Sequence, residues 1–220
     1  PMIRQSSYFR RLPSITVAQF QDHWQNRHAE VVTQLPGIVR YIQNHTTAAL
    51  PGRTAPFDGI AEVWFESKDA MKANVGSDAL RRIRTDEANF IDASSMGTII
   101  TDDFYLKEPG PAETKLMALV RRQPDLSLDE FTRKYRDEFG PLVANLAGIA
   151  GYLQGHCALG AYRDGREPPY DALATLWFAD AEGMQATFGS SEMASISEIE
   201  QHILQLDKVD AILCQEVVII

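Results

Sequence analysis

Apolar residues recur at steps of three and four between residues 17 and 35, which predicts an amphipathic helix. Its apolar stripe comprises Val17, Phe20, Trp24, His28, Val31 and Leu35. Thr16 and Gln19 have the spacing of a capping box at the helix start, and Pro36-Gly37 marks its end. A histidine therefore stands in the middle of a face that should pack against a sheet.

Alternation of apolar and polar residues predicts strands on both sides of this helix. We expect strands over residues 2–11, 38–46, 58–66 and 98–106. A second helical segment is expected over residues 67–93, with a break near Val75-Gly76-Ser77. The order β-α-β-β-α-β is that of a ferredoxin-like unit.

The same pattern returns 111 residues later, where Ser127 and Glu130 repeat the capping box of Thr16 and Gln19. Further matched pairs are Phe20/Phe131, Trp24/Tyr135, Leu35/Leu146, Gly37/Gly148, Tyr41/Tyr152, Gln43/Gln154 and His45/His156. Such a fixed offset indicates an internal duplication. We expect two domains, residues 1–107 and 115–220, joined by a Pro- and Gly-containing linker at 108–114.

A four-stranded sheet with helices on one face leaves its other face apolar, and a second identical sheet is the simplest cover. We therefore expect an α+β fold in which two tandem ferredoxin-like βαββαβ repeats form a fused, intrachain dimeric α/β barrel. The fused chain could pair further as a homodimer.

The charge balance limits the choice of partners. The formal net charge of −9 argues against nucleic acid or an anionic membrane surface. No apolar run approaches the ~20 residues that cross a bilayer, and the N-terminus has no signal-peptide pattern, so a cytoplasmic location is expected. The two cysteines, Cys157 and Cys214, are expected to be buried thiols.

The differences between the repeats indicate where chemistry is expected. Phe139 stands at the position of His28, and Thr175 at that of Glu62. Gln5-Ser6-Ser7-Tyr8 in the first strand is matched by Leu116-Met117-Ala118-Leu119. Because uncompensated polar groups in a core are unfavourable, a pocket in the first repeat is the simplest explanation. The second repeat is expected to be degenerate.

The candidate catalytic residues are His28, Tyr41 and His45, and the candidate substrate-binding residues are Ser6, Tyr8, Trp24, Glu62, Trp64 and Phe90. For Tyr41 and His45 the alternative to a catalytic role is a purely structural one, because the second repeat retains both as Tyr152 and His156. Glu62 is either a general base or a salt-bridge partner of Arg4 or Arg10. His23 is expected to be solvated, and Asp86-Glu87 to begin a helical turn. No cofactor is expected. No metal site is expected either, because His23 and His28 are five residues apart and so lie on different helix faces.

Four motifs together resemble the EthD-like branch of the dimeric α/β-barrel superfamily. They are the run of Phe20, Trp24 and His28, the turn Leu35–Tyr41, the strand Asp58–Phe65, and Asp86–Phe90. The resemblance implies a ferredoxin-like fold and small-molecule chemistry without an organic cofactor. Members include methylmuconolactone methylisomerase and polyketide or aromatic-acid decarboxylases and cyclases. In the isomerase-like members, the site groups correspond to His28 and Tyr41.

The sequence thus predicts a cofactor-independent enzyme that acts by proton transfer on a small aromatic, lactone or polyketide-like substrate. Decarboxylation or C–C lyase chemistry is the first expectation. The alternatives are an isomerase or cyclase of the methylmuconolactone methylisomerase type, or a non-catalytic protein that binds a hydrophobic metabolite or haem.

Overall fold

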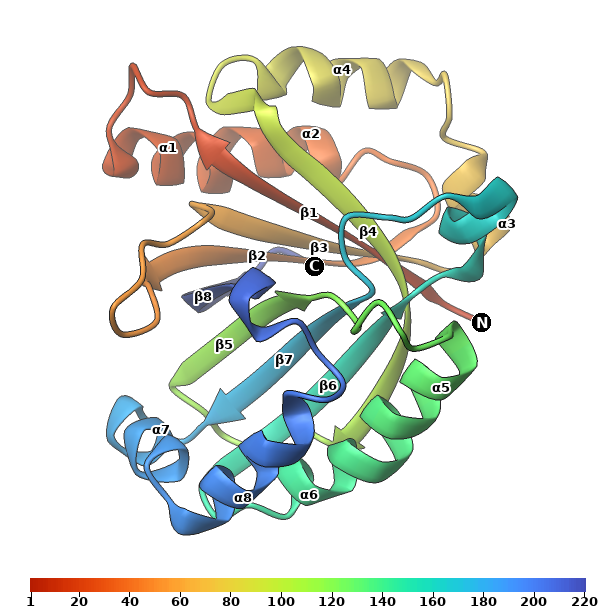
Figure 1. Ribbon diagram of the computed structural model, residues 1–220. Coiled ribbons are helices and arrows are strands. Elements are labelled where there is room, and N and C mark those ends of the chain that lie inside the picture. Colours follow the sequence, from red (N-terminus) through yellow and green to blue (C-terminus); the bar gives the residue numbers. More distant parts are fainter. The chain divides into compact units, whose positions relative to one another are not determined.

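The computed structural model describes all residues from Pro1 to Ile220, which pack as two compact units (Figure 1). Unit 1 comprises residues 1–48, 53–100 and 214–220, and unit 2 comprises residues 49–52 and 101–213. The sequence repeat had placed the division at residues 108–114. The packing units divide elsewhere because strands β4 and β8 each run from one unit into the other.

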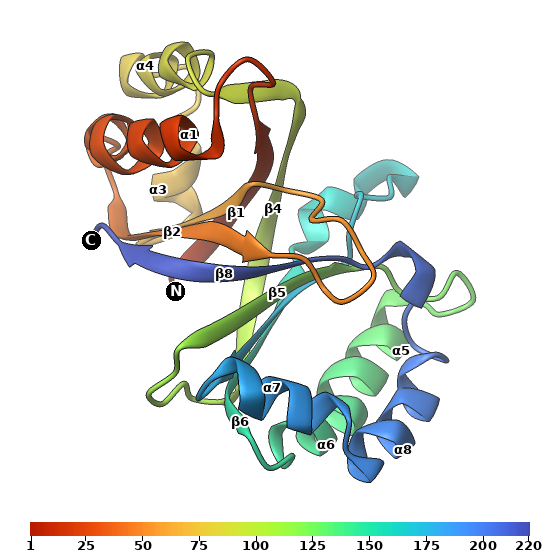
Figure 2. The ribbon, with the colours of Figure 1, turned by 90° about the vertical axis from the view of Figure 1, so that its left-hand side faces the viewer.

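Unit 1 contains the first repeat's helices and strands. They are β1 (Ile3–Arg11), α1 (Val17–His23), a π-helical segment (Trp24–His28), α2 (Ala29–Val32), β2 (Ile38–Ala48), β3 (Gly59–Phe65), α3 (Lys68–Lys72), α4 (Asp78–Glu87) and the first part of β4 (Ile91–Lys107). Strand β3 pairs antiparallel with both β1 and β2. Helices α1, α2 and α4 lie on one face of these strands (Figures 1 and 2).

Unit 2 repeats this order. Its elements are β5 (Thr114–Val120), α5 (Leu128–Thr132), a π-helical segment (Arg133–Phe139), α6 (Gly140–Ala144), β6 (Ile149–Cys157), a 3₁₀ segment (Leu159–Gly165), β7 (Ala172–Phe178), α7 (Ala181–Phe188), α8 (Ser191–Glu200), a short 3₁₀ turn (Leu206–Lys208) and β8 (Asp210–Val218). Strand β7 pairs antiparallel with both β5 and β6.

The hydrogen-bonded strand order is β1-β3-β2-β8-β5-β7-β6-β4, which is the order of a closed barrel. The second part of β4 pairs with β6, for example Asp102 with His156. Strand β8 is the neighbour of β2, and just beyond the end of β8 Tyr41 N–H donates to the Ile220 carbonyl. The expected α+β fold with two ferredoxin-like repeats in a fused α/β barrel is confirmed.

Strand β4 is longer than the sequence predicts. It begins at Ile91 instead of residue 98, and the preceding helix ends at Glu87. Residues 91–97 lack a strand-like alternation, and pairing with β1 orders them: Arg10 N–H donates to Ser95 Oγ at 2.8 Å. The break in the second helical segment is confirmed, because α3 and α4 are separated at Gly76, whose φ of 75° favours glycine.

The first helix of each repeat begins with the predicted capping box. Thr16 Oγ1 accepts from Gln19 N–H, and the Gln19 side chain accepts from Thr16 N–H. Ser127 and Glu130 form the same pair of bonds. Such a cap stabilises a helix by about 1 kcal/mol.

Both first helices widen into a π-helical turn that the sequence pattern did not predict. In unit 1 the Trp24 carbonyl accepts from Ala29 N–H, five residues on, and also from Gln43 Nε2 at 2.7 Å. In unit 2 the Tyr135 carbonyl accepts from Gly140 N–H and from Gln154 Nε2 at 2.9 Å. A side chain inserted into the helical ladder is a known cause of such a turn.

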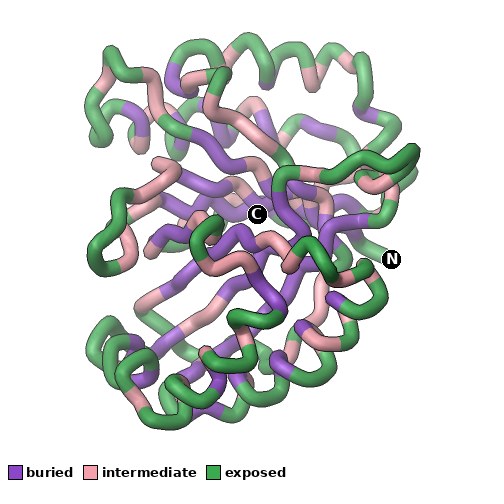
Figure 3. The backbone as a smooth tube through the Cα atoms, in the orientation of Figure 1, coloured by how far each residue is buried: buried purple, intermediate pink, exposed green.

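The strands contribute most of the buried residues, and the outer helix surfaces are exposed (Figure 3). None of the helices is long and apolar enough to span a membrane.

Candidate active site

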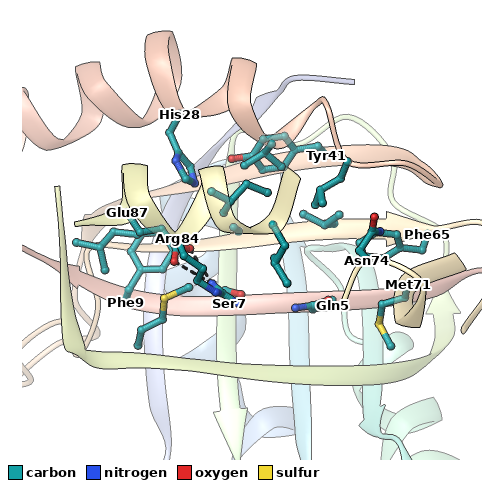
Figure 4. A pocket seen from close by; sticks show the side chains of 18 of the residues that line it. Gln5, Ser7, Phe9, His28, Tyr41, Phe65, Met71, Asn74, Arg84 and Glu87 are labelled. Atoms are coloured by element: carbon teal, nitrogen blue, oxygen red, sulfur yellow. Dashed lines mark hydrogen bonds and ion pairs between the residues drawn. The ribbon is translucent and has the colours of Figure 1, made fainter. Parts of the chain in front are cut away.

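Unit 1 contains a cavity of about 300 Å³ between its helices and the helix-facing side of its strands (Figure 4). Most of its wall is apolar, with Trp24, Val32, Ile83 and Met96 among the lining residues. The polar side chains that line it are Gln5, Ser7, His28, Tyr41, Lys72, Asn74, Arg84 and Glu87. An apolar cavity with a few converging polar groups is the usual form of a small-molecule site.

His28 projects from the π-helical turn into this cavity (Figure 4). Its Nδ1 lies 2.7 Å from Asp86 Oδ2. No protein group forms a hydrogen bond with its Nε2, and only 4% of the residue is exposed to solvent. One ring nitrogen is therefore held by a carboxylate while the other remains available to a ligand.

Asp86 lies in the last turn of α4 and connects the two helices that flank the cavity. Both of its carboxylate oxygens also lie 3.0 Å from His23 Nε2, and Asn89 Nδ2 donates to Oδ1 at 3.2 Å. Burial alone would raise the pKa of Asp86, but the hydrogen bonds from His28, His23 and Asn89 lower it overall. Asp86 is therefore an ionised acceptor at neutral pH.

Burial lowers the pKa of His28 below its usual 6.5, and the nearby Asp86 opposes this effect only in part. The imidazole is therefore neutral at neutral pH. Because Asp86 can only accept, the single ring proton resides on Nδ1, and Nε2 carries a free lone pair that faces the cavity. This is the arrangement of a general base oriented by a carboxylate.

Tyr41 lines the same cavity and is almost completely buried. Its hydroxyl accepts from Gln43 Nε2 at 3.0 Å and donates to no protein acceptor. Burial raises the pKa of Tyr41, and the hydrogen bond from the Gln43 amide opposes this effect only in part. The phenol therefore stays protonated and can donate a hydrogen bond to a ligand.

Gln43 is the centre of a hydrogen-bonded group that the sequence pattern did not predict; we call this group, formed by Trp24, Tyr41, Gln43 and His45, the clamp. Its amide donates to the Trp24 carbonyl and the Tyr41 hydroxyl, and it accepts from His45 Nε2 at 3.0 Å. The same bonds occur in unit 2 among Tyr135, Tyr152, Gln154 and His156. The clamp joins the first helix of each repeat to the strand that follows it. Because both repeats have the clamp, it does not distinguish the cavity of unit 1 from that of unit 2.

His45 belongs to this clamp and does not line the cavity. Its ring lies 4.4 Å from that of Trp24, and burial lowers its pKa to about 4. His156 makes the same bond to Gln154, and burial is again the main cause of a pKa near 4. The position of His45 therefore fits a purely structural role. Tyr41, in contrast, belongs to the clamp and also lines the cavity.

Four candidate substrate-binding residues lie on the opposite face of the sheet from His28, which corrects the expectation that they surround it. They are Ser6, Tyr8, Glu62 and Trp64. Side chains alternate along a strand, and the alternate residues of β1 and β3, among them Gln5, Ser7, Ala61 and Val63, line the cavity instead. Glu62 forms a buried salt bridge with Arg4 at 2.7 Å and accepts from Asn44, which fits its interpretation as a salt-bridge partner of Arg4.

Trp24 and Phe90 are both buried beside His28, but they differ in role. Trp24 lines the cavity, and its indole N–H has no hydrogen-bond partner within the protein. Phe90 does not line the cavity and packs against the rings of His28 and His23, at 4.8 and 4.7 Å. Phe90 therefore packs against the two histidines from outside the cavity.

The expectation that His23 is solvated was wrong, because its Nε2 is paired with Asp86. Asp86 and Glu87 do begin a hydrogen-bonded turn at the end of α4, in which their carbonyls accept from Asn89 N–H and Phe90 N–H. The contact of Asp86 with both histidines was not expected. The signal was present in the sequence, since the Asp86–Phe90 motif and both helix histidines occur only in the first repeat. The helical spacing alone could not show that the two segments meet.

Unit 2 lacks the histidine–aspartate pair but keeps a cavity. From β3 and β7 onward the repeats align at an offset of 113 residues, so Ile199 corresponds to Asp86 while Phe139 replaces His28. Both members of the pair are thus absent from unit 2. Unit 2 nevertheless contains a cavity of about 310 Å³.

The histidines and carboxylates do not gather as a metal site. Nowhere along the 220 residues do three or more His, Cys, Asp or Glu side chains form a group that could hold a metal ion. Asp86 instead lies between the two rings as a shared acceptor.

Several solved structures share the fold at low sequence identity. An anthrone oxidase-like protein matches over 98% of this chain and 91% of its own, with a TM-score of 0.71 and 9% identity. A putative monooxygenase from Lactobacillus acidophilus NCFM matches over 99% and 95%, with a TM-score of 0.60 and 12% identity. A putative chlorite dismutase, TA0507, matches over 98% and 94%, with a TM-score of 0.53 and 15% identity. At these identities the likeness shows the fold alone.

Comparison of sequences identifies the family. No curated protein sequence matches this chain significantly. The sequence model of the EthD domain matches twice, over residues 12–94 and 123–203, and so covers most of both repeats. The chain therefore belongs to the EthD family, with two copies of the domain in one polypeptide.

Proposed function

We propose that unit 1 is a cofactor-independent enzyme that moves a proton on a small, largely apolar substrate containing a carbonyl group. The observation that carries this proposal is His28, with Nδ1 held by Asp86 and Nε2 unpaired toward an apolar cavity. Aromatic, lactone and polyketide-like compounds have the planar apolar body and the carbonyl that such a cavity favours.

The proposed step begins with removal of a proton from the carbon next to the carbonyl. His28 Nε2 takes the proton, the electron pair of the C–H bond moves toward the carbonyl oxygen, and an enolate forms. The imidazolium keeps its Nδ1–H bond to Asp86, whose negative charge stabilises it. Tyr41 is the group that can donate a hydrogen bond to the enolate oxygen, because its hydroxyl proton has no protein acceptor.

The protonation state of His28 before the reaction limits which type of reaction it can begin. Burial keeps His28 neutral, so it is ready to remove a proton but not to donate one. Isomerisation or cyclisation begins with proton removal, and the same imidazolium returns the proton at another atom. Decarboxylation leaves a carbanion that needs a donated proton. The neutral state of His28 therefore favours the isomerase or cyclase type over the decarboxylase type.

Deuterium exchange tests the proposal without knowledge of the natural product. The protein is mixed in D₂O with a panel of aromatic ketones, 1,3-diketones and unsaturated lactones, and exchange at the carbon next to the carbonyl is followed by NMR. Exchange above the buffer rate supports the proposal, and its lack across the whole panel counts against it. Oxygen uptake in the same assay would instead favour an oxidation.

The exchange rate should depend on pH through the ionisation of His28. Only the neutral ring can accept a proton, and burial lowers its pKa below 6.5. The rate should therefore be level from pH 6.5 upward and fall tenfold per unit once the pH drops below the lowered pKa. A rate that rises as the pH falls would show that His28 acts as an acid.

Replacement of Asp86 by asparagine should slow exchange by about 10- to 100-fold, because the amide no longer fixes the proton on Nδ1. Asp86 also raises the pKa of His28, so the acid limb of the pH–rate profile should move to lower pH in this variant. Asn89→Ala, which removes a neighbouring contact to Asp86 without touching His28, is the control. An unshifted limb would contradict a positioning role for Asp86.

A further inference from the structure

The cavity of unit 2 differs from that of unit 1 in its polar groups. Its wall is mainly apolar, with Leu116, Phe139, Val143 and Leu176 among the lining residues. Tyr135 and Tyr152 face it with hydroxyls that burial keeps protonated, since burial raises the pKa of both. Glu200 is the carboxylate in the wall.

Glu200 lies partly buried at the end of α8, and no protein cation or hydrogen-bond donor contacts its carboxylate. Burial raises the pKa of Glu200 to about 7. A carboxylate that faces an apolar cavity without a partner is unfavourable unless it takes up a proton or a cation pairs with it.

Unit 1 shows what the missing partner would be. Helices α4 and α8 are both ten residues long and both begin after a serine cap, Ser77 and Ser190. At the offset of 113 residues Glu87 corresponds to Glu200. In unit 1 Arg84 donates to both oxygens of Glu87, at 2.8 and 3.0 Å (Figure 4).

The residue in unit 2 that corresponds to Arg84 is Ser197, which also lines the cavity. A serine side chain carries no charge and is too short to replace the guanidinium. Unit 2 thus has the carboxylate and a cavity beside it, but it lacks the arginine that pairs with the carboxylate in unit 1.

We propose that the cavity of unit 2 is a second binding site, which takes a small organic amine with an apolar body. The ammonium group pairs with Glu200 in place of the arginine of the first repeat, and the apolar body fills the space beside Phe139 and Val143. A carboxylic acid of the same shape is repelled by Glu200. A neutral alcohol gains only an uncharged hydrogen bond, which is weaker than the charge-assisted one.

Titration calorimetry of the full chain with 2-phenylethylamine tests this site, with 2-phenylethanol as the neutral probe of the same shape. The wild-type protein should bind the amine at least tenfold more tightly than the alcohol. Glu200→Gln, which keeps the shape of the side chain, should abolish this preference. Ser197→Arg, which restores the ion pair of unit 1, should also lower affinity for the amine at least tenfold.

Two controls assign the binding to unit 2. Glu87→Gln, the matched change in unit 1, and His28→Phe should leave affinity for the amine unchanged. The site is therefore tested separately from the proposed enzymatic function. Failure of the amine to bind, equal affinity for amine and alcohol, retention of the preference in Glu200→Gln, or its loss in Glu87→Gln would each overturn the proposal. Circular dichroism of every variant confirms that it is folded.

Discussion

Replacement of His28 by phenylalanine should lower the rate of the proton-transfer reaction by about 10²–10⁴-fold. The variant removes the Nε2 lone pair that faces the cavity, and the protein has no other unpaired base at that position. Phenylalanine is the residue that the second repeat carries at the corresponding place, Phe139, where it packs in the same helical environment. The loss should appear in kcat under the deuterium-exchange assay.

The fold of this variant should persist, because a phenyl ring is easier to bury than an imidazole. Asp86 keeps its contacts with His23 and Asn89. We expect an unchanged or higher melting temperature, and unchanged turnover in the control His202→Phe, since His202 is exposed in unit 2. A folded His28→Phe protein with full activity would remove this histidine from the mechanism.

The second large effect concerns stability. Replacement of Gln43 by leucine should destabilise the protein by about 3 kcal/mol, since it leaves the His45 ring and the Tyr41 hydroxyl buried without their shared partner. The Trp24 carbonyl also loses a donor but keeps its bond from Ala29 N–H. Urea-induced unfolding, followed by circular dichroism, measures the change.

Gln154→Leu is the matched variant, because Gln154 makes the same three bonds in unit 2. Its stability loss should be similar in size. Turnover should fall only in Gln43→Leu, because Tyr41 then loses the bond that orients its hydroxyl in the cavity. A Gln43→Leu protein as stable as wild type would show that the clamp does not hold helix to strand.

The positions of the first helix and of its neighbours followed from local patterns. A helical stripe and a capping box depend on residues three and four apart, so Thr16, Gln19 and the apolar face could be read directly. The duplication made the prediction stronger, because two copies of the pattern independently gave the same elements. Side-chain alternation on one strand likewise placed Tyr41 and Gln43 together.

Other features depend on segments that are distant in the sequence. Asp86 is 58 residues from His28, and no local periodicity shows that the end of α4 meets the first helix. The face on which β1 places its polar residues depends on register with β3, and a shift of one residue exchanges Ser6 for Ser7. The π-helical turn lies where a glutamine on a different element donates to the helix backbone.

The sequence by itself determined that this chain is a duplicated α+β domain with a histidine in one helix stripe and a phenylalanine in the other. Those properties depend on short-range periodicity and on comparison of the two copies. The tertiary structure decided which carboxylate holds that histidine, which strand residues line its cavity, and that the second repeat kept an open cavity. These outcomes depend on how helices and strands pack, which contacts near in sequence do not specify.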